Sequence, residues 1–235
     1  MTDRRGRFAL PTIIAVLVAA NIVANSALDS WAIVLGNVIA SALLIRIAGS
    51  GGVTIAGIGI DRDSIARGWQ IGRWFLLATS VAFALGVALP WTRDWFEDER
   101  VRTMGFPVIM WRALITVPFG TVLLEELAFR GVLPALFARR HPPWRSYLSA
   151  SLLFGAWHVL PAWDIFKVNP ALRDVLHGAA GRAVAISFGV VSTAVIGVVW
   201  CWLRYRSRSL VTTMIAHAAT NSLGYVFSYL AWSLA

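Results

Sequence analysis

Charged residues and cysteine are both scarce in this sequence of 235 residues. Only 14% of the residues are Asp, Glu, Lys or Arg, whereas a soluble domain has about 25%. The single cysteine, Cys201, lies inside an apolar run, which excludes an intrachain disulfide and any cysteine-based metal site. No internal repeat, low-complexity tract or separate soluble domain is evident. The shortage of charge excludes an ordinary soluble domain.

Apolar residues dominate the chain instead. They make up 58% of it, and the mean hydropathy is +0.68, which predicts a polytopic integral membrane protein. The net charge of +9 comes from twenty arginines and one lysine against twelve acids. The arginines form short clusters between apolar runs, not a basic stripe interleaved with aromatics. We therefore expect contact with anionic lipid headgroups and no nucleic-acid partner.

The apolar runs predict an all-α fold with seven transmembrane helices, or eight if one segment is re-entrant, around a buried polar site. They cover residues 8–24, 31–48, 74–91, 106–138, 147–163, 183–203 and 210–235. The first run follows a basic start, as a cleavable signal peptide would, but the second run follows at once and favours a retained span. The fourth run exceeds one perpendicular span, so we expect it to be tilted, kinked or partly interfacial.

The segments between these runs are short or polar. The glycine-rich stretch at 49–59 is too short to cross a bilayer. Residues 61–73 are polar and are expected at the membrane interface, and residues 164–182 are expected to form a polar loop.

Arginine clusters set the expected orientation. In a seven-span arrangement, one side collects the clusters at 4–7, 62–73, 139–145 and 204–208. Loops on the other side have fewer basic residues, or acids outweigh them, as at 92–102. The positive-inside rule then places the N-terminus in the cytoplasm. Arginine in place of lysine is typical of a GC-rich bacterial genome, so we expect a bacterial plasma membrane.

Two adjacent carboxylates, Glu125 and Glu126, lie with Arg130 in the middle of the fourth apolar run. Glu125 is thirteen residues after Arg112 and fourteen before Arg139, or roughly 20 Å of helix from each flanking charge. In a hydrocarbon core about 30 Å thick, the acidic pair would lie deep. An ionised side chain there costs at least about 3 kcal/mol, which predicts a function.

Helical geometry gives the two acids different neighbours. Glu126 and Arg130 are four residues apart and project about 40° from each other, whereas Glu125 and Arg130 project about 140° apart. We therefore predict that Glu126 neutralises Arg130. Glu125 has no obvious local counter-ion, and a desolvated, unpaired carboxylate suits a general base near neutral pH. The alternative is that all three residues form one structural ion cluster between helices.

Two further apolar runs carry histidine near the same expected depth. His158 lies in the fifth run, and His217 and Asn221 share one face of the last. His141 and His177 lie in polar loops. A single intramembrane histidine often makes only an interhelical hydrogen bond. Polar side chains on three spans tend to converge, however, because lipid offers them no partner.

The chemistry that such a cluster can support is the attack of activated water on a carbonyl carbon. Glu with His can take a proton from water, and a second His with an Asn carboxamide can donate hydrogen bonds to the oxyanion. Two Glu and two His could also hold zinc, but the H-E-x-x-H pattern is absent. No G-x-S-x-G sequence for a serine nucleophile is present either.

These residues resemble the motifs of a known family. Glu125-Glu126-x-x-x-Arg130, Phe154-x-x-x-His158 and His217-x-x-x-Asn221, in that order on three late spans, resemble the three motifs of the CPBP family. That family, also called ABI, comprises CAAX proteases and bacteriocin-processing enzymes and includes the Ras-converting prenyl-protein endopeptidase. The resemblance covers residues 113–221. It implies that N-terminal transmembrane helices and an interfacial loop at 1–105 precede a catalytic helical core at 106–235.

The resemblance implies a metal-independent intramembrane glutamic endopeptidase, without a cofactor, that cleaves a membrane-associated protein or peptide. By motif position, Glu125 and His158 would activate water, and His217 with Asn221 would form the oxyanion hole. Glu126, Arg130 and Phe154 would support the site. The alternative is a non-catalytic membrane scaffold or bacteriocin-immunity protein. The absence of an internal repeat disfavours a proton-coupled transporter.

Overall fold

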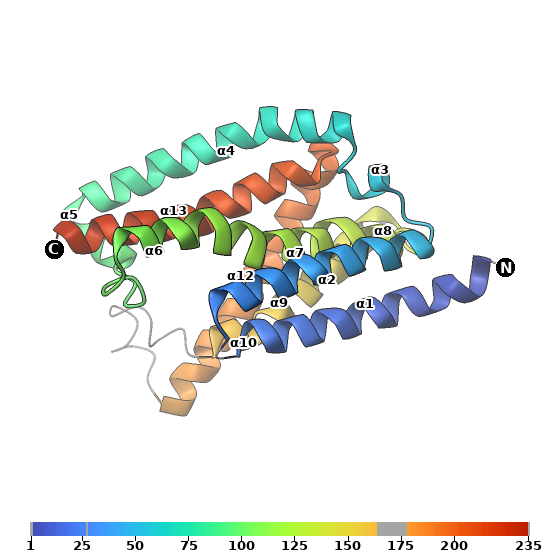
Figure 1. Ribbon diagram of the computed structural model, residues 1–235, viewed down its shortest axis with the longest axis horizontal. Helices are drawn as coiled ribbons and strands as arrows, with labels where there is room; N and C mark the ends of the chain where they lie inside the picture. The colour runs from blue at the N-terminus through green and yellow to red at the C-terminus, as the bar shows by residue number, and fades with distance from the viewer. Residues whose placement is uncertain (1, 27, 164–177, 235) are drawn as a thin grey trace.

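The computed structural model describes residues 2–26, 28–163 and 178–234. The described residues form helices joined by short connections, without a strand among them (Figure 1). The all-α prediction is therefore confirmed.

A long helix covers each predicted apolar run in full or in large part. These helices are α1 Thr2–Ala24, α2 Ser30–Ser50, α4 Arg62–Ala88, the composite segment Phe106–Phe137, α9 Pro143–Trp157, α12 Gly178–Ser207 and α13 Leu210–Leu234. The shorter elements are α3 Ile55–Ile58, α5 Pro90–Arg93, the 3₁₀ turn η1 Asp94–Phe96 and α10 Val159–Ala162.

Four of the helical segments are long and apolar enough to cross a bilayer, which fits an integral membrane protein. They are Ser30–Ser50, Ile55–Ala88, Phe106–Phe137 and Gly178–Ser207. The apolar part of α1, Phe8–Ala24, is shorter.

Several predicted boundaries differ from the structure. Residues 62–73, predicted as a polar interfacial segment, are continuous with the third apolar run in α4, which begins after Asp61 accepts a hydrogen bond from the Ser64 amide at 3.2 Å. Of the predicted polar loop at 164–182, residues 164–177 lie outside the described residues. Residues 178–182 are helical and begin α12. The fifth run breaks at His158, where α9 gives way to α10.

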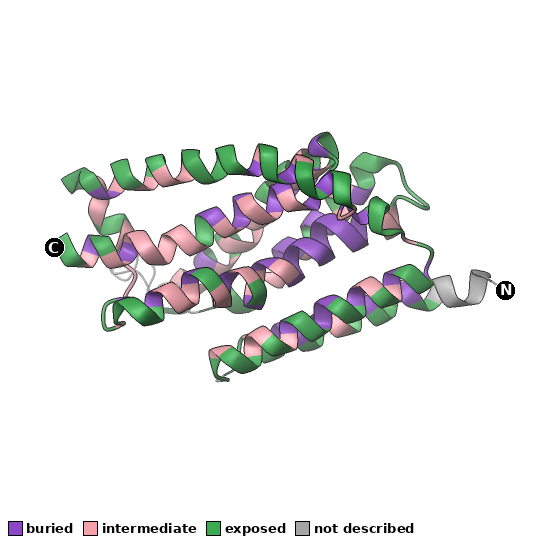
Figure 2. Cartoon of the chain, turned by 45° about the horizontal axis from the view of Figure 1, so that its top comes forward, coloured by how far each residue is buried: buried purple, intermediate pink, exposed green. Residues whose placement is uncertain are grey.

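The segment that carries the two acids is one long helix with wide turns. It runs through α6 Phe106–Trp111, η2 Arg112–Thr116, η3 Pro118–Val122, α7 Leu123–Glu126, η4 Leu127–Val132 and α8 Leu133–Phe137. The three η elements are π-helical, with hydrogen bonds between residues i and i+5, a geometry that recurs at functional sites. Residues 124–134 are all buried, so this helix forms the centre of the bundle (Figure 2).

Close packing between α4 and α13 positions the helix that carries His217 and Asn221. A Cβ atom added to Gly68 would lie 2.1 Å from Ser209 Oγ, and one added to Gly72 would lie 2.6 Å from Ile215 Cδ1. Small residues four apart let two membrane helices approach in this way. A larger residue at either glycine would push α4 and α13 apart.

Three predicted basic loops meet at one end of the bundle. Arg67 Nε donates to the Ser207 carbonyl at 2.9 Å, and the guanidinium groups of Arg139 and Arg204 donate to carbonyls of the loop between α2 and α4. Helix α1 begins at this end and α13 finishes at the other (Figure 1).

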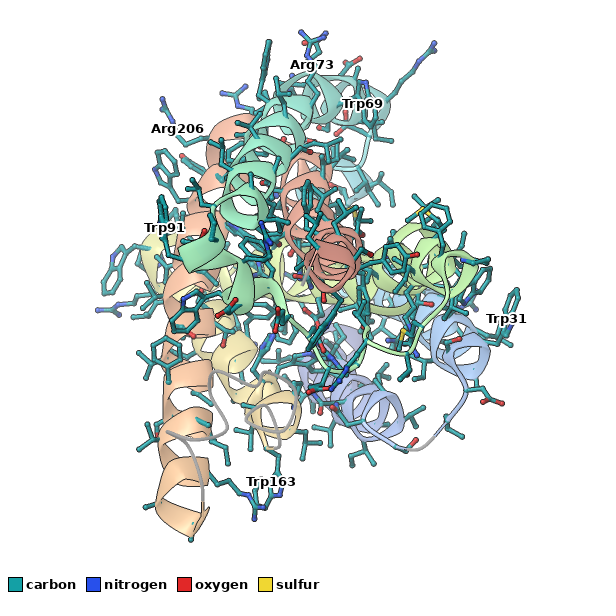
Figure 3. The ribbon with its side chains drawn as sticks, turned by 90° about the vertical axis from the view of Figure 1, so that its left-hand side faces the viewer. Trp31, Trp69, Arg73, Trp91, Trp163 and Arg206 are labelled. Atoms are coloured by element: carbon teal, nitrogen blue, oxygen red, sulfur yellow. The ribbon has the colours of Figure 1, made fainter. Side chains whose placement is uncertain are left out.

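Aromatic side chains surround the bundle. Trp31, Trp69, Trp91 and Trp163 are exposed and point away from the helices (Figure 3). Tryptophan in such positions is typical of the membrane–water interface.

Candidate active site

A cavity of about 690 Å³ lies among α1, α2, α4, the central helix, α10 and α13. Three of the sequence-predicted site residues, Glu125, His158 and Asn221, line it, although they come from three different helical segments. The predicted convergence of these polar residues is confirmed. The volume is within the usual range of small-molecule and peptide sites, which is about 300–1,000 Å³.

Glu125 faces this cavity with one oxygen paired and one unpaired. Its Oε1 accepts a hydrogen bond from the indole Nε1–H of Trp157 at 2.9 Å. Its Oε2 is buried, has no hydrogen-bond partner among the described residues, and lies 3.9 Å from His217 Nε2. The residue is only 6% exposed, so Oε2 is a desolvated acceptor beside the cavity.

Glu126 points away from the cavity and is fully buried. Its Oε1 lies 3.3 Å from Arg130 Nη1, so the predicted ion pair is confirmed. The same oxygen lies 2.9 Å from His217 Nδ1, a contact between helices that the sequence did not predict. Glu126 therefore connects the buried arginine to the histidine of α13.

Aromatic rings enclose the guanidinium of Arg130. Its Cζ lies 3.8 Å from the ring centroid of Phe154 and 5.1 Å from that of Trp200. Cation–π contacts of this kind contribute about 2 kcal/mol when desolvated. Phe154 thus stabilises the buried charge and also links the central helix to α9.

His158 lies where α9 ends, and its backbone conformation (φ −86°, ψ 3°) interrupts the helix. Its Nδ1 lies 2.8 Å from the Phe154 carbonyl oxygen. A carbonyl can only accept, so Nδ1 carries the proton and Nε2 of the neutral ring keeps its lone pair. That Nε2 can accept a proton from a molecule in the cavity.

His217 and Asn221 are in contact one turn apart on α13. Asn221 Nδ2 lies 3.1 Å from His217 Nε2, and Thr220 Oγ1 lies 3.3 Å from Asn221 Oδ1. Because Nδ1 of His217 donates to the Glu126 carboxylate, its Nε2 accepts one N–H of the Asn221 amide. The second N–H of that amide has no partner in this chain of contacts.

Neither of the two remaining histidines is among the described residues that line the cavity. His141 is exposed in the connection before α9, and His177 lies outside the described residues. In the described part of the chain, no group of three or more His, Cys, Asp or Glu side chains is arranged to hold a metal ion.

The charged loop after α5 forms one wall of the cavity. Asp98 and Arg100 both line it, and they form an ion pair with each other. The loop is fixed to α13, because the Asp98 amide donates to Ser228 Oγ at 3.1 Å and Trp232 Nε1 donates to the Asp98 carbonyl at 3.0 Å.

Sequence reasoning did not identify three polar residues that shape this site. Trp157 donates to Glu125, Asn21 donates to the Trp157 carbonyl at 2.9 Å, and Asn37 Nδ2 donates to the Gly120 carbonyl at 2.6 Å. Both asparagines lie inside predicted apolar runs, where a polar side chain is costly. An asparagine inside an apolar run was therefore the feature of the sequence that could have identified these two residues.

A family model described as type II CAAX prenyl endopeptidase Rce1-like matches residues 104–223, about half of the chain. The matched range contains all the sequence-predicted site residues. No curated protein and no solved structure matches the chain.

Proposed function

Because the chain belongs to the Rce1-like family of type II CAAX prenyl endopeptidases, we propose that it hydrolyses a peptide bond in a membrane-associated protein or peptide, with Glu125 as the base. One observation carries the proposal: Glu125, His158 and Asn221 line one cavity, and Glu125 Oε2 is buried beside it without a partner. Glu126 Oε2 is also buried without a partner, but only Glu125 of the two acids lines the cavity.

Water activation is assigned to Glu125 and His158. Glu125 Oε2 is the free acceptor that takes a proton from water, while its Oε1 is held by Trp157. The unprotonated Nε2 of His158 accepts a hydrogen bond from the same water. This bond orients the water so that a lone pair of its oxygen faces the carbonyl carbon of the substrate. Attack on the carbonyl carbon gives a tetrahedral oxyanion. Return of the proton to the departing amine completes hydrolysis.

Oxyanion stabilisation is assigned to Asn221 and His217. The second N–H of the Asn221 amide donates to the oxyanion. His217 takes part in the same hole, because its Nε2 accepts the first N–H of the Asn221 amide and so orients the second N–H toward the oxyanion. This chemistry uses no metal or cofactor.

Glu126, Arg130 and Phe154 are assigned a supporting role. Glu126 orients His217 through Nδ1, Arg130 neutralises Glu126, and Phe154 packs on the guanidinium. None of the three lines the cavity, so none is expected to touch the substrate.

The topology that fits this function has seven spans, with residues 1–105 as N-terminal helices and residues 106–235 as the catalytic core. The basic loops lie together at one end of the bundle, which supports an orientation with the N-terminus in the cytoplasm. The proposed setting is a bacterial plasma membrane. In that membrane the substrates would be prenylated proteins, as the name of the family indicates, or peptides that are cleaved during maturation.

Replacing Asn221 with Ala should lower kcat by about a hundredfold to a thousandfold, the usual cost of losing one oxyanion donor. Asn221 is exposed to the cavity, so the unfolding temperature should barely change. The measurement is cleavage of a membrane-delivered peptide in detergent, together with thermal unfolding. A variant that cleaves as fast as the parent would remove Asn221 from the oxyanion hole.

Orientation can be tested by labelling cysteines in a Cys201→Ser background, since Cys201 is the chain's single cysteine. A cysteine introduced by Arg102→Cys should react with an impermeant thiol reagent in intact cells. One introduced by Arg140→Cys should react only after permeabilisation. The reverse pattern would contradict a cytoplasmic N-terminus.

A further inference from the structure

A chain of two hydrogen bonds joins the first helix to Glu125. Asn21 Nδ2 on α1 donates to the Trp157 carbonyl at 2.9 Å, and Trp157 Nε1 donates to Glu125 Oε1 at 2.9 Å. Asn21 is 7% exposed, and Asn25 Nδ2 in turn lies 3.3 Å from Asn21 Oδ1. Helix α1 lies outside the matched range 104–223, and in this chain of contacts Trp157 joins it to the proposed base.

The surroundings of Trp157 explain why these bonds matter. Its side chain lines the cavity that contains Glu125 and also a second cavity of about 270 Å³. Apolar side chains of α1, such as Leu17 and Ile22, line the second cavity together with Phe129 and Leu160. Trp157 is partly buried and packs against the hydrophobic core. Its position is set by this packing, which includes Phe129 at a centroid distance of 5.6 Å, and by the hydrogen bonds at each end.

We infer that Asn21 and Trp157 are positioning residues: α1 holds the backbone of Trp157, and the Trp157 indole holds the carboxylate of the base. The inference rests on the proposed function of Glu125. By occupying Oε1, the indole fixes the orientation of the carboxylate and leaves Oε2 as the oxygen without a hydrogen-bond partner, 3.9 Å from His217 Nε2. Neither residue touches the reacting atoms.

The test compares Trp157→Phe, which removes the N–H but keeps an aromatic ring, with Asn21→Leu, which removes the amide at similar size. Trp91→Phe is the matched control, because Trp91 is 74% exposed and is not among the residues that line the cavity. Trp157→Phe should lower kcat roughly tenfold to a hundredfold, the usual worth of a hydrogen bond to a charged group. KM should change by no more than about twofold, because Phe keeps an aromatic ring at the cavity wall.

Asn21→Leu should show a smaller fall in kcat, and the double variant should be no slower than Trp157→Phe alone, because Asn21 acts only through Trp157. A residue that merely filled space would instead change KM or unfolding temperature, and its effect would add to the other. The inference would be overturned if the effects of the two substitutions on kcat were additive, or if Trp157→Phe had the same kcat as Trp91→Phe. In either case an active parent protein would leave the proposed function unaffected.

A second readout needs no substrate. The indole N–H resonance of Trp157, identified by its absence in Trp157→Phe, should move upfield in Glu125→Ala, because its acceptor is lost. It should also move in Asn21→Leu, because α1 no longer fixes the backbone. An indole resonance unchanged by both substitutions would show that Asn21 and Glu125 are not connected through Trp157. A parent protein that cleaves nothing, with the resonance shifts present, would instead overturn the proposed function.

Discussion

Replacing Glu125 with Gln is expected to reduce cleavage by about a hundredfold to ten-thousandfold, the usual contribution of a general base. Glutamine has the volume of glutamate and keeps a carbonyl oxygen for the Trp157 indole, so the geometry of the site should survive. It cannot take a proton from water. The measurement is the initial rate of cleavage of a membrane-delivered peptide by purified protein.

Thermal unfolding of the same preparation separates chemistry from folding. The unfolding temperature of Glu125→Gln should equal or exceed that of the parent, because a desolvated oxygen without a partner no longer carries charge. A variant that is folded and cleaves as fast as the parent would contradict the assignment of Glu125 as the base.

Replacing Glu126 with Gln is expected to destabilise the protein by about 3–5 kcal/mol, the usual cost of breaking a buried ion pair. Both side chains of the pair are fully buried, so Arg130 would be left with only its aromatic neighbours. Activity should also fall, because His217 Nδ1 loses its carboxylate partner. The measurement is the free energy of unfolding in detergent, taken with cleavage.

Glu99→Gln is the matched control for this variant. Glu99 pairs with Arg102 at 3.6 Å, a spacing close to that of the buried pair, but the arginine side chain is 59% exposed. Exposed pairs contribute about 0–1 kcal/mol, so this variant should be close to the parent in stability. If Glu99→Gln and Glu126→Gln lowered the free energy of unfolding equally, burial of the Glu126–Arg130 pair would not be the reason that its loss destabilises the protein.

The two adjacent carboxylates thus differ because successive side chains on a helix face different surroundings. Glu125 faces a cavity, and Glu126 faces the protein interior. The predicted partner of Glu126 could be read from the sequence because a spacing of four fixes two side chains on one helix face. The same angle predicted that Glu125 does not pair with Arg130, and in the structure its Oε1 is bonded by Trp157 while its Oε2 has no partner.

Contacts between helices could not be read from the sequence. The pairs Glu126–His217 and Trp157–Glu125 join residues that are 91 and 32 positions apart. Their geometry depends on how α9 and α13 pack against the central helix, which apolar periodicity does not determine. In the same way, depth in the membrane predicted that His158 and Asn221 converge with Glu125, but not which atoms would be left free.

Local backbone features were also missed. The π-helical turns at 112–116, 118–122 and 127–132 have no signature in the apolar pattern, although they allow a run of over thirty residues to remain one helix. The end of α9 at His158 has neither Gly nor Pro at that position. A hydrogen bond from the His158 ring to the Phe154 carbonyl occurs there instead.

The most direct test of the central claim is a comparison of membrane-associated peptides in cells that contain the parent chain and cells that contain Glu125→Gln, by quantitative mass spectrometry. The account predicts new peptide termini in the parent cells that disappear in the variant, at equal protein levels. Identical sets of termini in both cells, with both proteins folded in the membrane, would contradict it.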